Sequence, residues 1–418
     1  MHETGSSRSE ISSQAEAASS CPRPPGLSPD DITAVTSASL ENWFSQMVPR
    51  CKAYAIAQKQ AGHPIVGLLC EYAPRELILA AGGVPVCLCG GDPDTIPAAE
   101  SVLPANLCPL IKSTFGYHVE RTNPFLEMAD LLVAETTCDG KKKMFELMGK
   151  ERPTLLLELP QKENDPDAFD HWVRELRGFR TALASRFGVD ITDAKIRAAS
   201  HLMNRERRLR RSLAELMKAN HPPFTGRQLL DFKSLISTLP SDLSQYEKAL
   251  EYYRAQPPPL PSGRPPVRIL LTGVPLVHGA ERVLELIESH GGCVVCMENC
   301  TGLKPILDEV DETADDPLLA LATKYYALPC SVKTPNQSRL SLIRRLAAEY
   351  QAQCVIELVW HACHTYNVEA VHVKRLAENE LRLPYLKIET DYAPSDSARI
   401  AVRLEALFET VRSVGCIE

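Results

Sequence analysis

The chain has 418 residues, enough for two or three domains that each bury a substantial core. Hydrophobic residues make up 44% and charged residues 24%, which is typical of a globular protein. A net charge of −7 argues against nucleic-acid binding, and no run of about 18 apolar residues predicts a membrane span. The first residues lack the apolar core of a signal peptide, so we expect a cytoplasmic protein whose thiols stay reduced.

The first third of the chain alternates between short apolar segments and helical segments. Residues 1–30 are rich in Ser, Glu and Pro and predict a disordered tail, and residues 31–61 have helical character. Strands are predicted at 64–70, 84–89, 130–135 and 154–158, with a helix at 74–82 after the first. Continuously apolar strands that alternate with helices indicate a parallel sheet covered on both faces. Residues 31–165 are therefore expected to form an N-terminal Rossmann-like domain.

A helical segment and a linker come next. Residues 166–255 have a helical pattern and include the Arg-rich run 205–211, which suggests a docking face for an acidic partner. The Pro-rich stretch 256–266 predicts an extended linker.

The α/β pattern then restarts in residues 267–418. Strands are predicted at 268–272, 293–298, 354–359 and 385–389, and helices at 281–290, 338–350 and 369–379. The expected fold class is α/β, with two Rossmann-like parallel-sheet domains related by internal duplication and a helical segment between them.

Six of the fourteen cysteines form a pattern that occurs twice. Cys108 and Cys138 lie 30 residues apart (138 − 108), and Cys330 and Cys363 lie 33 apart (363 − 330). Each half adds one more cysteine at a strand end, Cys70 and Cys300. Ligands of open parallel sheets gather at the carboxyl ends of the strands, so these thiols predict a soft-metal site.

The residues alone leave the metal open. Long spacings and three thiols per half favour an iron–sulfur cubane over zinc, which prefers short CxxC pairs and four ligands. His361 and His364 flank Cys363 and keep a mixed Cys/His zinc site as an alternative. The other cysteines are expected to be buried strand thiols (Cys87, Cys89, Cys293, Cys296, Cys354) or incidental (Cys21, Cys51, Cys416).

Read with their neighbours, these residues resemble the 2-hydroxyacyl-CoA dehydratase and benzoyl-CoA reductase family. The resemblance extends over roughly residues 45 to 415. It rests on five segments: Cys70–Pro85, Cys108–Ser113, Thr137–Lys142, Asn204–Arg208 and Pro222–Gly226.

A second cysteine set makes the chain most similar to the double-cubane cluster proteins of that family. This set comprises Glu298–Gly302, Pro329–Ser331 and His361–His364. The resemblance implies an 8Fe-9S cluster of two bridged 4Fe-4S cubanes, held by Cys70, Cys108, Cys138, Cys300, Cys330 and Cys363. It also implies an anaerobic homodimer that reduces a small molecule such as acetylene. A separate ATP-hydrolysing iron–sulfur reductase would supply the low-potential electrons.

The chain lacks a G-x-x-x-x-G-K-S/T phosphate loop, so ATP chemistry is assigned to the partner. Reduction also needs protons, and His361, His364, Glu71 and Glu298 are candidate donors because each is close in sequence to a predicted ligand. Two other functions stay open. One is a 2-hydroxyacyl-CoA dehydratase-type lyase component with a single 4Fe-4S cubane; the other is a non-catalytic metal-binding or electron-carrier protein.

Overall fold

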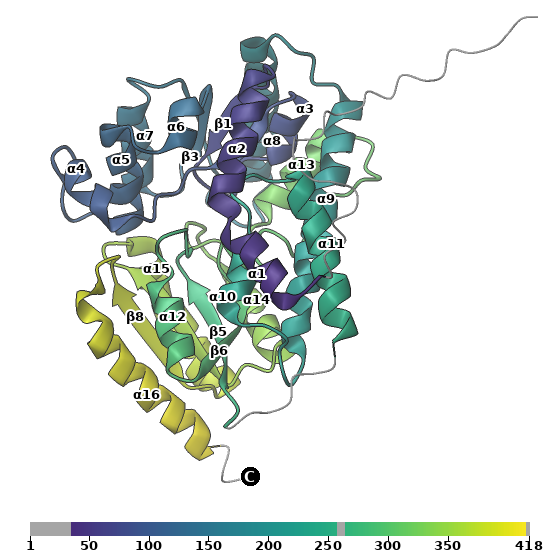
Figure 1. Ribbon diagram of the computed structural model, residues 1–418. Coiled ribbons are helices and arrows are strands. Elements are labelled where there is room, and N and C mark those ends of the chain that lie inside the picture. Colours follow the sequence, from purple (N-terminus) through teal and green to yellow (C-terminus); the bar gives the residue numbers. More distant parts are fainter. Residues whose placement is uncertain (1–34, 257–263, 415–418) are drawn as a thin grey trace, which may run out of the picture.

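The computed structural model describes the backbone of residues 35–256 and 264–414 (Figure 1). The predicted tail at 1–30 and most of the predicted linker lie outside this range, as do Cys21 and Cys416. No helix among the described residues is both long and apolar enough to span a bilayer.

The N-terminal half contains a four-stranded parallel sheet. Its strands are β1 (Ile65–Leu68), β2 (Val84–Cys87), β3 (Leu131–Glu135) and β4 (Thr154–Leu157), in the order β2-β1-β3-β4. The two central strands are buried along their whole length, whereas the edge strand β4 is partly exposed. This explains why the central strands are continuously apolar in sequence.

The C-terminal half repeats this arrangement. Its strands are β5 (Val267–Gly273), β6 (Gly292–Met297), β7 (Cys354–Trp360) and β8 (Tyr385–Thr390), in the order β6-β5-β7-β8. All eight predicted strands are present, and the second sheet has the strand order of the first. The expected fold class, two Rossmann-like parallel sheets, is therefore confirmed.

Seven helices, among those described, precede or surround the first sheet. They are α1 (Ser37–Ser45), α2 (Met47–Gln60), α3 (Arg75–Ala80), α4 (Ile96–Glu100), α5 (Pro109–Glu120), α6 (Pro124–Met128) and α7 (Asp139–Met148). The helix predicted at 74–82 is α3, which begins directly after Pro74. Helices α5 and α7 were not predicted, and each begins immediately after a cysteine of the pattern.

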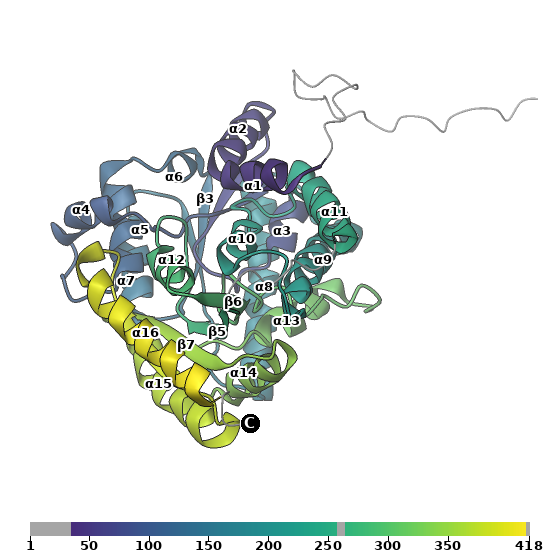
Figure 2. The same ribbon diagram turned by 60° about the horizontal axis from the view of Figure 1, so that its bottom comes forward.

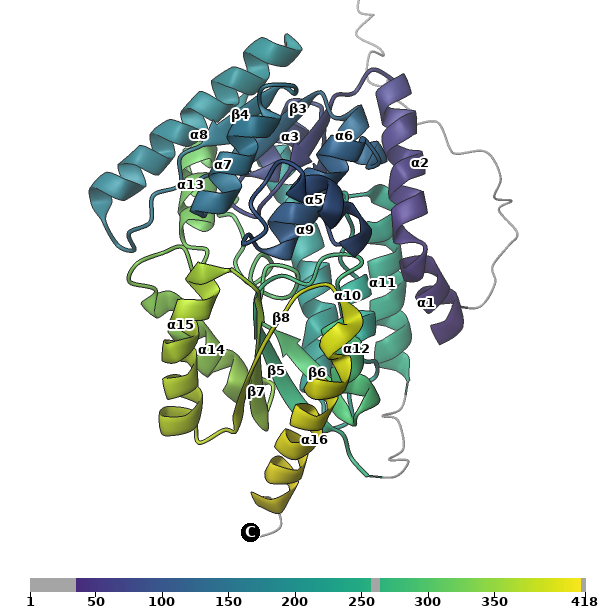
Figure 3. The same cartoon turned by 90° about the vertical axis from the view of Figure 1, so that its left-hand side faces the viewer.

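The segment between the sheets is helical, as predicted. It contains α8 (Pro166–Phe187), α9 (Asp193–Glu215), α10 (Gly226–Asp231) and α11 (Pro240–Ala255). Asp165 caps the first turn of α8, and Gly188 ends this helix with a positive φ that glycine adopts without strain. Figures 1 and 3 show the two sheets one above the other, with α9 and α11 running alongside both.

The second sheet is covered by α12 (Arg282–Ser289), α14 (Gln337–Glu349), α15 (His364–Arg375) and α16 (Ser397–Val414). The helix expected at 369–379 starts earlier, at His364, and continues into a π-helical turn at Leu376–Leu381. Helix α16, which was not predicted, packs against β5 and β8 (Figure 2).

One connection of the C-terminal half crosses to the N-terminal half. Helix α13 (Pro317–Tyr326), between β6 and β7, packs on α8 and α9. Its residues Leu321 and Tyr325 share one hydrophobic core with Leu77 of α3 and Trp172 of α8. The connection therefore carries Cys330, which follows α13, to the first sheet.

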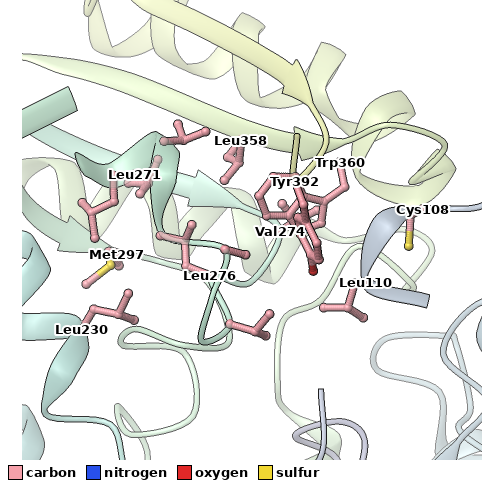
Figure 4. Packing of buried hydrophobic residues seen from close by; sticks show 14 of the residues in the cluster. Cys108, Leu110, Leu230, Leu271, Val274, Leu276, Met297, Leu358, Trp360 and Tyr392 are labelled. Atoms are coloured by element: carbon pink, nitrogen blue, oxygen red, sulfur yellow. The ribbon is translucent and has the colours of Figure 1, made fainter. Parts of the chain in front are cut away.

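The matching connection of the N-terminal half crosses in the other direction. Residues 88–130, between β2 and β3, contain Cys108 and Leu110, which pack in one core with Trp360 and Tyr392 of the C-terminal half (Figure 4). Each of these two equivalent connections thus packs against the opposite half of the chain. Boundaries drawn along the sequence remain a prediction, and they do not separate the two cores in space.

The Arg-rich run on α9 does not form the free basic surface that a docking face requires. Arg205 pairs with Glu247, Arg208 and Arg211 with Glu309, and Arg210 with Glu206. Arg207 is buried, 2.6 Å from Glu76 of α3. Except for the Arg210–Glu206 pair, which lies within α9, these contacts tie α9 to neighbouring segments.

Candidate metal centre

The six cysteines of the pattern gather into two groups of three. The first trio is Cys70, Cys300 and Cys330. Cys70 follows β1, Cys300 follows β6, and Cys330 follows the crossing helix α13. Burial raises the pKa of Cys70 well above its usual value, and the neighbouring Cys300 and Cys330 add to that shift. Burial likewise raises the pKa of Cys300 to about 11, with a contribution from Cys330. Cys70 therefore lies near both Cys300 and Cys330, and Cys300 lies near Cys330.

The second trio is Cys108, Cys138 and Cys363. Burial raises the pKa of Cys108 to about 11, and Cys138 raises it further. Burial raises the pKa of Cys363 to about 12, with contributions from Cys108 and Cys138. Burial thus favours the protonated forms of Cys70, Cys300, Cys108 and Cys363, so that binding a metal to these thiols would release protons.

Each cysteine of the second trio is the residue that begins a helix. Cys108 precedes α5, Cys138 precedes α7 and Cys363 precedes α15. Backbone groups of the first turn act against burial and lower the pKa of Cys108 and Cys363. Three helix N-termini therefore converge on this trio, and helix N-termini favour thiolate and anionic ligands.

The grouping differs from three thiols per half, because each trio draws on both halves. Cys138 and Cys363 occupy equivalent places after β3 and β7, and Cys108 and Cys330 lie in equivalent connections. Cys70, however, follows β1, whereas Cys300 follows β6, the counterpart of β2. The crossing connections produce this mixed grouping, which spacing alone does not reveal.

Lysines that the sequence reasoning missed surround the thiols. Lys141 of α7 lies close to Cys70 of the first trio and Cys138 of the second, and its ammonium donates to the Leu69 carbonyl at 2.6 Å. Burial alone would lower the pKa of Lys141, but its interactions with the nearby cysteines and Glu135 raise it, so the side chain stays charged. Lys304 is buried beside Cys300 and Cys330 and pairs with Glu298 at 3.0 Å. The signal for Lys141 was its place three residues after Cys138, on the same first helical turn.

Two of the four proposed proton donors are held ionised. Glu71 lies 2.9 Å from Arg75 and 2.7 Å from Lys233. Burial would raise its pKa, yet these two charges lower the pKa of Glu71 to about 2. Glu298 is buried between Lys304 and Arg339, whose charges overcome burial and lower its pKa as well. Both carboxylates neutralise cations and have no proton to give near neutral pH.

The two histidines lie at the surface beside the second trio. The His361 side chain is 51% exposed, with Nδ1 3.7 Å from Asp391 Oδ2, and His364 is exposed at the start of α15. They remain predicted donors.

Glu135, at the end of β3, is a candidate acid that the sequence reasoning did not single out. It is fully buried; Oε1 accepts the Ala73 N–H, and Oε2 has no hydrogen-bond partner among the described residues. Burial raises the pKa of Glu135 to about 7, against a lowering by Lys141. An acid on an otherwise apolar strand, three residues before Cys138, was the available signal.

A cavity borders the first trio where the two halves meet the helical segment. Its lining includes Cys70 and Cys300 together with aliphatic side chains and with the charged or titratable side chains of Glu71, Lys141, Lys233, His278 and Glu281. The halves touch closely here, because a Cβ at Gly91 would overlap the carbonyl oxygen of His278.

Cys87 and Cys89 also line this cavity and are half-buried. Their expected role as buried strand thiols therefore needs correction, since β2 ends at Cys87 and leaves both side chains at the cavity. Cys293, Cys296 and Cys354 are buried as expected.

Within the described residues, no three His, Cys, Asp or Glu side chains lie close enough together to hold a single metal ion. A multi-iron cluster places its thiolates farther apart than one ion does, because each sulfur binds a different iron.

Comparison with known proteins identifies the family. The family model for the 2-hydroxyglutaryl-CoA dehydratase D-component matches residues 70–411, which include all six cysteines. The chain belongs to the 2-hydroxyacyl-CoA dehydratase and benzoyl-CoA reductase family.

Individual relatives align with most or with part of the chain. YjiM of Escherichia coli (strain K12), whose name assigns it provisionally as a dehydratase subunit, is 38% identical over 84% of this chain and 92% of its own length. The (R)-phenyllactyl-CoA dehydratase beta subunit of Clostridium sporogenes is 21% identical over 88% of this chain and 98% of its own. A component of the benzoyl-CoA reductase of Thauera aromatica is 26% identical over 35% of this chain and 38% of its own. Family membership thus agrees with the predicted resemblance.

Proposed function

We propose that this protein is an iron–sulfur reductase that carries an 8Fe-9S double-cubane cluster and reduces a small molecule. The observation that carries the proposal is the gathering of six thiols into two trios, each with cysteines from both halves. Three thiolates suit one cubane whose fourth iron is free to bind a bridge or a substrate. Two trios on either side of Lys141 suit two such cubanes.

The residues around the thiols fit an anionic cluster. Lys141 and Lys304 bring buried positive charge to the trios, and three helix N-termini point at the second trio. Tyr72 and Tyr366, both buried, stand beside the thiols of the first trio and keep water away from them. Compensating charge and exclusion of water are the means by which a protein sets the potential of a cluster.

When bound, the cluster supplies one-electron transfer at low potential. The chain supplies protons and a place for the substrate. Glu135, whose pKa lies near neutrality, can hold a proton beside Cys70 and the Lys141 ammonium. The cavity next to Cys70 and Cys300 is the proposed substrate site, because it combines aliphatic side chains with polar groups such as Lys141 and Lys233 that can orient a small molecule.

The partner and the assembly are also proposed. An ATP-hydrolysing iron–sulfur reductase delivers the electrons, and two copies of this chain form a homodimer. The support for the partner is the family together with the absence of a phosphate loop in this sequence.

A second candidate function is a lyase component of the 2-hydroxyacyl-CoA dehydratase type with a single 4Fe-4S cubane. It is favoured by the matched family model and by relatives named as dehydratase subunits. In this case only one trio would hold iron, and the enzyme would bind an acyl-CoA.

Iron content separates the two candidates. The protein, purified without oxygen, is expected to contain about eight irons per chain, whereas a single cubane gives about four. Acyl-CoA binding together with about four irons would favour the lyase. Zinc in place of iron would contradict both candidates.

A further inference from the structure

A second cavity lies among α3, α9, α13 and the segment that follows α10. Its lining is rich in cations, and each of these four segments contributes at least one: Arg75, Arg207, Arg210, Lys233 and Lys324. Lys233 also lines the cavity beside the first trio, so the two cavities are neighbours. The proposed function does not use this second cavity.

Carboxylates neutralise only part of this positive charge. Three of them form four ion pairs with the lining: Glu71 with Arg75 at 2.9 Å and with Lys233 at 2.7 Å, Glu76 with Arg207 at 2.6 Å, and Glu206 with Arg210 at 3.5 Å. Among the Lys, Arg, Asp and Glu side chains of this cavity and their ion-pair partners, five cations therefore face three carboxylates. Two positive charges are in excess, although buried charges in proteins are normally paired.

Lys324 is the cation that has no carboxylate partner among the described residues. It is only 6% exposed; its Nζ donates to the Pro305 carbonyl at 3.2 Å and lies 4.2 Å from the centre of the Tyr325 ring. A carbonyl and an aromatic ring stabilise an ammonium group without cancelling its charge. Arginine stays protonated in proteins, so even a neutral Lys324 would leave one positive charge in excess.

We propose that this cavity binds a small oxyanion with two negative charges, of the class of hydrogen phosphate and sulfate. Guanidinium groups present paired N–H donors that match the oxygens of such anions, and Arg75, Arg207 and Arg210 bring three of them to one cavity. The Lys233 and Lys324 ammonium groups add positive charge. A dianion would balance the two excess charges. It would also link α3 and α9 to the crossing helix α13, because the cations come from all three helices.

Binding of inorganic phosphate to the full chain tests the proposal. Isothermal titration calorimetry at constant ionic strength is expected to find one site per chain. Phosphate and sulfate should bind at least about tenfold more tightly than chloride, because only a dianion with several oxygens matches both the charge and the donors. The site needs no iron. Phosphate binding can therefore fail while the proposed function holds, and the proposed function can fail while phosphate still binds.

Two variants and a control locate the site. Lys324→Met and Arg210→Met should each weaken phosphate binding at least about tenfold, because each removes a charged donor. Without phosphate, Lys324→Met should unfold at a higher temperature than the parent, since it removes a buried charge that has no carboxylate partner. Saturating phosphate should raise the unfolding temperature of the parent and leave that of Lys324→Met nearly unchanged.

The matched control is Lys333→Met. Lys333 is 4% exposed and its Nζ lies 4.0 Å from the centre of the Tyr326 ring, but it does not line the cavity. This variant should bind phosphate as tightly as the parent does.

Three outcomes would overturn the proposal. The first is that phosphate and sulfate bind no more tightly than chloride. The second is phosphate binding that is unchanged in both Lys324→Met and Arg210→Met. The third is that adenosine monophosphate binds more tightly than inorganic phosphate and displaces it, which would assign the cations to a phosphate group carried by a larger molecule.

Discussion

Each trio contains three thiols, but the two trios lie in different surroundings. The first trio is enclosed: Glu71, Asn299, Thr301 and Ser331, which adjoin its cysteines, are all buried, and the trio borders the cavity. The second trio lies under the surface: the Asp139 side chain next to Cys138 is 93% exposed, and His364 next to Cys363 is exposed. Helix N-termini adjoin the second trio, whereas Lys304, which is paired with Glu298, adjoins the first. The comparison teaches that a duplicated fold can give two similar groups of thiols different exposure to solvent and different neighbouring charges.

The largest expected effects come from removing one cysteine of either trio. Cys330→Ala and Cys363→Ala should each lower iron from about eight to about four per chain, because each removes a ligand of a different cubane. Reduction of substrate should fall by at least about a hundredfold in both variants, since a buried ligand has no substitute. Iron analysis and an activity assay test this. Cys293→Ala, in strand β6, is the control and should retain its iron.

Double variants distinguish cysteines of the same trio from cysteines of different trios. The double variant Cys70→Ala/Cys330→Ala should lose no more iron than either single variant, because both residues belong to the first trio. Combining Cys330→Ala with Cys363→Ala should remove nearly all iron. The reverse pattern would disprove the grouping.

The enclosure of the first trio depends on the crossing helix α13. Arg207 ties α9 to Glu76 of α3 at 2.6 Å and to the Tyr325 hydroxyl of α13 at 3.0 Å, all of them buried. Arg207→Ala should reduce the free energy of unfolding by about 3–5 kcal/mol, because it leaves Glu76 buried without its partner. Chemical denaturation measures this.

Arg205 offers a control on the same helix. It pairs with Glu247 at 2.7 Å, but both side chains are nearly half exposed. Arg205→Ala should cost less than about 1 kcal/mol. Equal losses in the two variants would contradict the idea that the buried contact holds α13 in place.

The raised pKa of Glu135, near the first trio, predicts that the stability of the folded chain depends on pH. Its pKa of about 7 in the folded chain lies above the usual 4.5, so folding takes up a proton between these values. The stability from this proton is fully present below about pH 4.5 and is lost as pH rises through 7, a change of about 3 kcal/mol. In the metal-free chain, Glu135→Gln should remove this loss. The thermal unfolding temperature of the variant should then be close to that of the parent at pH 5 and higher than that of the parent at pH 8.

A suitable control is Glu146→Gln, because the Glu146 side chain is 59% exposed on α7. It should show no such difference. A parent protein whose stability does not fall between pH 5 and pH 8 relative to Glu135→Gln would show that Glu135 is ionised throughout.

The smallest expected effect concerns Lys141, which adjoins both trios. Lys141→Met should lower the reduction potential of the bound cluster by roughly 50–100 mV, because a buried positive charge stabilises the added electron. An EPR-monitored redox titration measures the shift. Lys142→Met, at a 44% exposed position next in sequence, should shift the potential much less. Equal shifts in the two variants would show that solvent screens the charge of Lys141 as strongly as it screens the charge of Lys142.

Much of the fold was predictable because its signals are local. Buried parallel strands are continuously apolar, so the pattern located all eight strands, and their repetition predicted the two sheets. Helix α13 was missed together with its crossing to the N-terminal half, because amphipathic spacing shows that a helix packs but not against what. The partners of Cys330 and Cys108 follow from that crossing and could not be deduced from spacing.

The candidate site was predictable in its thiols and less so in their neighbours. Cysteines at strand ends are visible in sequence, whereas the charge state of an acid depends on what packs against it. Glu71 and Glu135 show this: one is held ionised by Arg75 and Lys233, and burial favours the protonated form of the other. The place of Lys141 three residues after Cys138 was visible in the sequence, but its burial was not, because a lysine can also extend from such a position into solvent.

The central claim is that both trios hold iron. An anaerobic crystal of the protein, measured on both sides of the iron absorption edge, tests it most directly. We expect anomalous iron density at Cys70, Cys300 and Cys330 and a second density at Cys108, Cys138 and Cys363. Iron at one trio alone, or density at neither, would contradict it.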